Sequence, residues 1–352
     1  MKILMLVNWK VEYGREKPMD KQPPDYCIGS EQYWFYRYFS HQPELDVVDI
    51  SSFPWLETFE KNKLRFYVWQ TLRVLHRLHR YDLIVSHGMQ SGVVLSLWRR
   101  LFKTRAKHIV FDIGSFNSAA EVGFALKLMQ FASKSIDGII YHTSSQKDYY
   151  QKFFPWIIEK SRFIRFGTDP EFFTNQGLQT KQDEEPYIIC VGYSNRDWKT
   201  VVAAWQKLNM PVKLRFVGKI LPEYQGIPGL EQVSYIPVRE LMEQVHNAAF
   251  CVLPLQSFNY SYGQMTLMQQ MALGKCVITA RVPSLVDYVR HGDTALLYTP
   301  EDPEDLCEKM GMVWKNQLLL KKIGLAGQRY LRSECNEAIM AKEIEAFFAQ
   351  IV

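Results

Sequence analysis

Short apolar runs alternate with helix-length segments along the whole chain. In the first half these runs are KILMLVN, LDVVDI, DLIVS, HIVFDI, GIIYH and RFIRF, and in the second half they are YIICVG, VKLRFVG, VSYI, FCVLPL, KCVITA and ALLY. Near-continuous apolar runs separated by helices are typical of parallel strands that are buried on both faces. The pattern therefore predicts an α/β protein with two doubly wound, Rossmann-like domains, which we expect to face each other across a cleft.

A polar linker, residues 174–185, separates the two halves of the pattern. A chain of 352 residues exceeds the usual size of a single hydrophobic core. We therefore place an N-terminal domain at 1–175 and a C-terminal domain at 186–333. The last segment, 334–352, is amphipathic and is expected to pack as a helix on a domain surface. Its apolar side consists of Ile339, Ile344, Phe347 and Phe348.

Composition places the chain among folded globular proteins, with 47% hydrophobic and 22% charged residues. The longest apolar runs are too short to cross a bilayer, and the N-terminal MKILMLVNWK lacks the apolar core and cleavage site of a signal peptide. The six cysteines are scattered singly, without a C-x-x-C pair, which favours free thiols over disulfides or zinc. We therefore expect a cytoplasmic protein.

Basic residues are concentrated in the first half, although the formal net charge is only +5. Between Lys61 and Lys107 there are eleven Lys and Arg residues against one acidic residue, Asp82. This excess favours an anionic partner: a membrane surface, a phosphate-bearing lipid or a polyanion. Nucleic acid is not expected as a partner, because no recognisable binding module accompanies the charge.

The stretch 61–80 is predicted to form a helix with two unlike sides. The apolar side consists of Leu64, Val68, Leu72 and Leu75, and the basic side consists of Arg65, Trp69, Arg73 and Arg77. Basic residues interleaved with an aromatic one suit an anionic membrane surface or a lipid-linked acceptor. An ordinary solvated helix explains them equally well. The segment 61–107 therefore leaves open a peripheral position on the inner face of the membrane.

The first candidate site follows the first strand of the second half, in VGYSNRDWKT. Gly192 lets the chain turn, and Arg196 and Lys199 place two cations on the following loop. Negative charge that develops on a diphosphate needs a metal or fixed cations. The chain has no Asp-x-Asp pair at a strand end, so these cations are the candidates for this role. The alternative is solvated surface charge.

The second candidate site lies in YSYGQMTLMQQMALGKCVI. Gly263 precedes a helix whose N-terminal amides can receive a phosphate. On this helix Gln269 or Gln270 can reach a ribose diol, although a neutral amide binds more weakly than a carboxylate. The full set of second-half residues that we expect to bind the diphosphate-bearing ligand consists of Gly192, Arg196, Lys199, Gly263, Gln264, Thr266, Gln269 and Gly274.

The first half offers three further candidate positions. We assign them to a second ligand, the acceptor of a transferred group. Gly29 and Ser30 in PPDYCIGSEQYWFY are expected at a helix start, where Ser30 is equally well explained as a plain N-cap. His87 and Asp112 each end an apolar strand next to a glycine, so both are expected to point into the cleft. A single histidine is more often structural, whereas an acid that ends a buried strand needs a partner or a function.

The order of these motifs resembles that of the family 4 retaining glycosyltransferases of the GT-B fold. SRFIRFGTDPEFF is similar to the family segment N-G-(I/V)-D-x-x-x-F, with Gly167, Asp169 and Phe173 matching. MALGKCVITA is similar to the family run M-A-x-G-x-P-V-(I/V)-A-(T/S). Its matching residues are Met271, Ala272 and Gly274, and Cys276 replaces the usual proline.

The chain departs from the family pattern at the residues that carry its chemistry. The Glu-x7-Glu pair of the family falls near Ser261 and Gln269, so both glutamates are absent. Asp112 or a neighbour stands in place of the family histidine. Tyr193 replaces the arginine after the first V-G of the second domain, which makes Arg196 the candidate for the diphosphate role.

The resemblance implies a nucleotide sugar in the second domain, an acceptor on the first, and no metal or further cofactor. It also implies retention of the anomeric configuration, with the leaving diphosphate helping to deprotonate the acceptor. We expect transfer to a cell-envelope, lipid-linked or polysaccharide acceptor, with Arg196 and Lys199 binding the diphosphate and Asp112 contacting the sugar or acceptor. The alternative is a non-catalytic sugar- or nucleotide-binding module, or a partner subunit, with a degenerate site.

Overall fold

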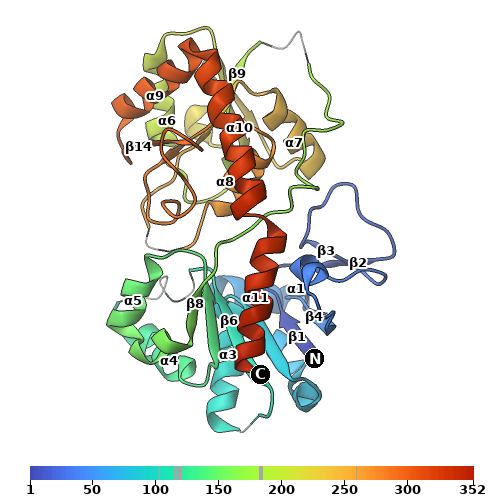
Figure 1. Cartoon of the computed structure of the whole chain (residues 1–352). Coiled ribbons are helices and arrows are strands. Elements are labelled where there is room, and N and C mark those ends of the chain that lie inside the picture. Colours follow the sequence, from blue (N-terminus) through green and yellow to red (C-terminus); the bar gives the residue numbers. More distant parts are fainter. Residues whose placement is uncertain (103, 115, 117–120, 182–184, 259) are drawn as a thin grey trace.

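The computed structural model describes residues 1–102, 104–114, 116, 121–181, 185–258 and 260–352 (Figure 1). Residue 103 of the basic segment and residues 182–184 of the linker lie outside this part of the chain. Within it, the protein forms two lobes, each built on a parallel sheet of six strands with helices on both faces. The predicted α/β fold with two doubly wound domains is confirmed.

The sheet of the first domain has the order β4-β1-β5-β6-β7-β8. Its strands are β1 (Lys2–Leu6), β4 (Glu44–Val48), β5 (Leu83–His87), β6 (Lys107–Asp112), β7 (Gly138–Tyr141) and β8 (Ser161–Phe163). A short parallel pair, β2 (Glu12–Gly14) and β3 (Tyr26–Ile28), is inserted after β1. The helices of this domain are η1 (Trp34–Tyr38), α1 (Pro54–Phe59), η2 (Glu60–Leu64), α2 (Val68–Leu72), η3 (Leu75–Arg80), α3 (Met89–Leu101), α4 (Phe124–Ser133), α5 (Gln146–Phe153) and η4 (Pro155–Lys160).

The sheet of the second domain has the order β11-β10-β9-β12-β13-β14. Its strands are β9 (Tyr187–Gly192), β10 (Lys213–Gly218), β11 (Leu230–Val233), β12 (Phe250–Leu253), β13 (Val277–Ala280) and β14 (Leu296–Tyr298). Its helices are α6 (Trp198–Leu208), η5 (Pro222–Tyr224), α7 (Val238–Asn247), α8 (Gln264–Ala272), α9 (Pro303–Lys315) and α10 (Gln317–Glu334). In chain order this is 3-2-1-4-5-6, the arrangement of dinucleotide-binding folds.

The last helix, α11 (Glu337–Ile351), crosses back from the second lobe and packs on the first (Figure 1). Ile344 and Phe348 are fully buried there, in one core with Ile3 and Ile109 of the first sheet. The C-terminal segment thus completes the core of the N-terminal domain, and the chain passes between the lobes twice.

The two passages between the lobes touch each other at Gly167. A Cβ atom at this glycine would collide with the carbonyl of Asn336, so only glycine fits where the passages cross. Glu337 N donates to Thr168 O at 3.0 Å, next to this contact. Gly167, which carries part of the family resemblance, therefore has a structural reason to be glycine.

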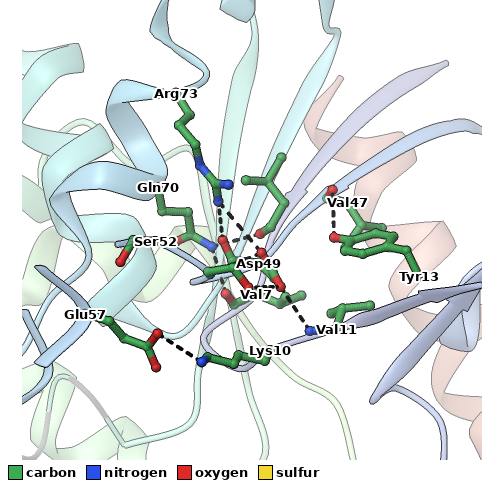
Figure 2. Close-up of polar contacts among 12 residues, drawn as sticks. Val7, Lys10, Val11, Tyr13, Val47, Asp49, Ser52, Glu57, Gln70 and Arg73 are labelled. Atoms are coloured by element: carbon green, nitrogen blue, oxygen red, sulfur yellow. Dashed lines mark hydrogen bonds and ion pairs between the residues drawn. The ribbon is translucent and has the colours of Figure 1, made fainter. Parts of the chain in front are cut away.

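The stretch 61–80 does not form the continuous amphipathic helix that its pattern predicts. The π-helix η2, the α-helix α2 and the 3-10 helix η3 divide it, with Arg65 in a left-handed conformation between the first two. Arg73 donates to the backbone carbonyl of Asp49 at 2.6 Å (Figure 2). Arg77 approaches the carboxylate of Asp46 at 3.8 Å. These two arginines are held by acids of the same domain, and no uniform basic face results.

No helix in the described residues is both long and apolar enough to cross a membrane.

Candidate active site

A cavity of about 350 Å³ lies between the two domains. The second domain contributes the loop after β9, the end of β10, the start of α7 and the N-terminus of α8 to its walls. The strand order reverses direction between β9 and β12, and ligands of doubly wound folds bind at this switch point. The opposite wall belongs to the first domain and consists of Asp20, Lys21, Gln22 and Asp25.

Arg196 is the cation that the second domain contributes to this cavity. Its guanidinium donates to Val191 O at 3.0 Å and to Ser194 O at 3.0 Å, so its position is set by the backbone of its own loop. Gly192 makes room for it, because a Cβ atom there would collide with the guanidinium group and the residue has φ +148°. Burial lowers the pKa of Arg196 to about 10, which still leaves it charged at neutral pH.

The N-terminus of α8 meets the same cavity. Gly263 has φ +81°, and a Cβ atom there would lie 2.6 Å from Leu255 Cδ1, so glycine is required for this turn. No described side chain caps this end of the helix, which leaves its first amides available to an anion. Thr266 Oγ1 in the first turn accepts a hydrogen bond from Arg196 at 3.3 Å. The Arg196 guanidinium and the uncapped N-terminus of α8 therefore lie side by side on the cavity wall, where both can contact one anion.

Two tyrosines that the sequence analysis did not select stand at the mouth of the cavity. The rings of Tyr193 and Tyr235 lie 6.4 Å apart at an interplanar angle of 37°, and both side chains are more than half exposed. Val217 and Ile236 line the wall beside them. These four residues give the cavity an apolar and aromatic part of its wall, which suits a flat heterocycle.

Of the eight predicted donor-binding residues, five line the cavity and three lie elsewhere. Lys199 is exposed on the first turn of α6. Gly274 follows the opposite end of α8, where φ +72° explains its identity. Gln264 is buried and donates to Thr143 Oγ1 and to Ser284 O, both at 2.9 Å, so it joins the two domains. These three expectations are corrected: Lys199, Gln264 and Gly274 are not among the residues that line the cavity.

Gly29 and Ser30 do not start a helix, contrary to the prediction. They form an exposed turn after β3, and the next helix, η1, begins only at Trp34. Without helical amides, nothing at this turn favours a phosphate, and neither residue lines the cavity.

Asp112 ends a buried strand as predicted, but its carboxylate is used within the first domain. It accepts hydrogen bonds from Tyr150 Oη at 2.5 Å, Gln146 Nε2 at 3.0 Å and Gly114 N at 3.0 Å. The side chain is fully buried. Because its partners belong to α5 and to the loop after β6, Asp112 holds these two segments together, and its full burial makes it inaccessible to a substrate.

His87 is buried among aromatic rings rather than directed into the cavity. Its ring centre lies 4.6 Å from that of Trp9, 5.5 Å from that of Trp34 and 5.7 Å from that of Phe111. Burial lowers the pKa of His87 to about 3, so the imidazole is neutral at physiological pH. Its surroundings are those of a core histidine.

The first-domain wall is the part of the site that the sequence analysis missed. Asp20, Lys21, Gln22 and Asp25 lie in the insertion between β2 and β3, which has no periodic pattern and no motif. In the described part of the chain, no group of three or more His, Cys, Asp or Glu side chains is arranged to hold a metal ion.

Comparison with known proteins gives a family match for the second domain and structural matches for the whole fold. Residues 185–316 match the family described as Glycosyl transferases group 1. The structure is similar to a sucrose-phosphate synthase from Thermosynechococcus elongatus, with a TM-score of 0.71 and 16% identity over 99% of each chain. It is also similar to Alr3699/HepE from Anabaena, solved with UDP and glucose, with a TM-score of 0.71, 12% identity and coverage of 99% of this chain and 100% of that one.

A third similar structure is TarM, with a TM-score of 0.61 and 14% identity over 79% of this chain and 57% of that one. No curated protein matches the chain in sequence. The structural matches establish the GT-B fold, and the family match confirms the resemblance in the second domain, which includes Met271, Ala272 and Gly274.

Proposed function

We propose that this protein is a glycosyltransferase that transfers a sugar from a nucleoside-diphosphate sugar to a cell-envelope, lipid-linked or polysaccharide acceptor. The observation that carries the proposal is the position of Arg196. Its partly buried guanidinium lies beside the uncapped N-terminus of α8, in the domain that matches group 1 glycosyltransferases. A diphosphate at this point would meet a fixed cation and free backbone amides together.

The shape of the cavity supports a nucleotide as the donor group. Its aromatic residues, Tyr193 and Tyr235, would hold the base, and Gln269 lines the same cavity. Alr3699/HepE, which shares the fold, has been solved with UDP-glucose. We assign the ribose to Gln269 and the diphosphate to Arg196, Thr266 and the backbone at Gly192 and Gly263.

In the proposed reaction the bond between the anomeric carbon and the diphosphate oxygen breaks, and a bond from that carbon to the acceptor oxygen forms on the same face of the sugar. Negative charge then grows on the leaving phosphate, where Arg196 and the first amides of α8 stabilise it without reorganisation. The acceptor proton passes to the leaving diphosphate. Neither His87 nor Asp112 is available as the base, because both are buried in the first domain.

A non-catalytic sugar- or nucleotide-binding module is the second candidate. It is favoured by the absence of the two family glutamates and by the involvement of Gln269 in a contact with Gln22. Such a module would bind a nucleotide but would not consume a nucleotide sugar.

Two measurements test the proposal and separate it from this alternative. Thermal unfolding with UDP, GDP and ADP should reveal one nucleotide that raises the melting temperature; stabilisation by none of them would contradict a donor site. Turnover of the corresponding nucleotide sugar is then measured for Arg196→Ala, the site variant, and for Lys199→Ala, a matched surface control. Arg196→Ala should lose turnover, and Lys199→Ala should keep it. Binding without any turnover by the wild-type protein would favour the module.

The exposed surface of α3 and α4 suits a lipid-linked acceptor and a peripheral position on an anionic membrane. On α4, Phe124 and Phe131 lie on one face with Lys127 between them. The Arg100 guanidinium lies 4.8 Å from the centre of the Phe131 ring, and Leu101 is 73% exposed beside it. Exposed aromatic and basic side chains of this kind insert into the headgroup region of anionic bilayers.

A further inference from the structure

The insertion between β1 and β4 reaches from the first domain to the donor cavity. In Figure 1 its loop, between β2 and β3, extends toward the upper lobe. Val238 N at the start of α7 donates to Asp20 O at 3.4 Å, and Gln269 Nε2 donates to Gln22 Oε1 at 2.8 Å. The insertion therefore contacts two elements of the second domain that line the cavity, α7 and α8.

The root of this insertion is held firmly at the carboxyl ends of β1 and β4. Asp49 accepts a hydrogen bond from Val11 N at 3.1 Å, and Gln70 Nε2 donates to Val7 O at 2.7 Å and to Val48 O at 2.8 Å (Figure 2). Asp49 and Gln70 are both buried, so these bonds are shielded from water. The insertion leaves the sheet in a defined direction.

Within the insertion, the backbone of Asp25 is fixed on both sides. Asp25 N donates to Gln22 O at 2.8 Å, and Asp25 O accepts from Glu12 N at 3.0 Å. The preceding carbonyl, of Pro24, accepts from Tyr33 Oη at 2.7 Å and from Trp9 Nε1 at 3.3 Å. Asp25 is therefore a positioned residue on the cavity wall and not part of a freely moving loop.

The carboxylate of Asp25 has no hydrogen-bond or ion-pair partner among the described residues. Lys21, whose charge acts on Asp25, is instead paired with Glu12 at 2.5 Å. Burial raises the pKa of Asp25 to about 6, and Lys21 opposes this only in part. A half-buried carboxylate without a donor is unfavourable and calls for an explanation. A ligand with hydroxyl groups would satisfy it.

We infer that Asp25 binds the hydroxyl groups of the nucleotide-sugar donor and replaces, from the first domain, the glutamates that the second domain lacks. This inference rests on the proposed function. A carboxylate accepts two hydrogen bonds from a diol, and such charge-assisted bonds are stronger than those of an amide. Because Asp25 and Arg196 belong to different domains, the donor site is complete only when the two domains are together.

The test compares Asp25→Ala and Asp25→Asn with Glu16→Gln, a change to an exposed acid of the same insertion. Affinity is measured by calorimetry for the nucleoside diphosphate that stabilises the wild type, for its 2′,3′-dideoxy form and for the nucleotide sugar. Asp25→Ala should weaken nucleotide-sugar binding about tenfold, Asp25→Asn should weaken it less, and Glu16→Gln should leave it unchanged.

The ligand series then separates the two sources of hydroxyl groups. If the ribose is bound, the effect of Asp25→Ala extends to the diphosphate and disappears with its dideoxy form. If the transferred sugar is bound, only the nucleotide sugar loses affinity. Unchanged affinity for both ligands would overturn the inference while leaving the proposed function intact, whereas a wild type that binds no nucleotide would overturn both.

Melting temperature distinguishes a binding residue from a structural one. If the Asp25 carboxylate stabilised the fold, its replacement would lower the melting temperature. Asp25→Asn instead removes an unpaired, desolvated charge, so it should leave the melting temperature at pH 7 unchanged or raise it. A clear decrease of the melting temperature, with weaker binding in proportion, would assign Asp25 to the fold and overturn the inference.

Discussion

The side-chain amide of Gln269 donates a hydrogen bond to Gln22 Oε1 at 2.8 Å, across the boundary between the two domains. Gln269 is the position at which the family resemblance places a glutamate, and Gln22 belongs to the insertion that forms the opposite wall. An amide in this position connects the two domains and lines the cavity in which we propose that the nucleotide binds.

Gln269→Glu should strengthen donor binding about three- to tenfold. The side chain keeps its length, a carboxylate accepts ribose hydroxyls through charge-assisted bonds, and the Gln22 amide can rotate to donate to it. Gln269→Ala should weaken binding by a similar factor. Calorimetric titration of both variants with the nucleoside diphosphate checks this. A glutamate variant that binds as poorly as the alanine variant would show that Gln269 does not face the ribose.

Gly192→Ala should reduce turnover nearly as much as Arg196→Ala, by about a hundredfold or more. The added Cβ atom would collide with the guanidinium group, which must then leave the cavity wall. Circular dichroism and the melting temperature serve as the control for folding, because φ +148° also strains an alanine. Steady-state rates decide the question: a folded Gly192→Ala protein with wild-type turnover would remove Arg196 from the mechanism.

Asp112→Asn should affect stability and not chemistry. The carboxylate accepts hydrogen bonds from both Tyr150 and Gln146, whereas an asparagine has only one acceptor oxygen on its side chain. The free energy of unfolding should therefore fall by about 1–3 kcal/mol. Denaturant unfolding measures this change. Turnover per folded molecule should stay within a factor of about two. A fall of a hundredfold or more in that rate, with stability preserved, would return Asp112 to the active site.

Acid should destabilise the protein through its buried histidines. Burial lowers the pKa of His87 to about 3 and that of His142 to about 4 in the folded state, so the unfolded chain binds protons that the folded chain refuses. The contribution of the two histidines to stability is present above their unfolded-state pKa of about 6.5. It is lost as the pH falls from there toward their folded-state pKa values. For His87 the loss between pH 7 and pH 5 is on the order of 2 kcal/mol.

His87→Phe isolates this contribution. Phenylalanine fits among Trp9, Trp34 and Phe111 without a titrating group. Urea unfolding at pH 7 and pH 5 should therefore show a smaller pH dependence for the variant than for the wild type. Equal slopes for the two proteins would mean that His87 is protonated in the folded state.

The surface of α3 and α4 should bind anionic vesicles. Flotation with phosphatidylglycerol-rich vesicles should recover more protein than flotation with phosphatidylcholine vesicles, and Phe124→Asp should abolish the difference, because a charge replaces an exposed aromatic side chain. Tyr13→Asp, at another exposed aromatic residue, is the control. Equal recovery of the wild type with both vesicles would exclude a membrane role for this surface.

Local sequence patterns were sufficient for most of the fold. The apolar runs coincide with strands β1, β4 and β5 in the first half and β9, β10 and β12 in the second, because strands buried on both faces need continuous apolar residues. The exception is β11, expected at VSYI but formed by Leu230–Val233, whose residues are only partly buried. An edge strand has weaker apolar requirements, so its pattern is less distinct.

The sequence by itself also pointed to three residues that line the cavity, since Gly192, Arg196 and Gly263 follow strands in an order that local geometry imposes. Only the tertiary structure decided which polar residues face the cavity. It buried Gln264 between the domains, placed Lys199 on an outer face and used Asp112 inside the first domain. It also brought Asp25 to a site more than 160 residues away along the chain. The physical reason is that strand and helix periodicity is a local property of the backbone, whereas the pairing of an insertion with the opposite domain depends on how two complete cores pack together.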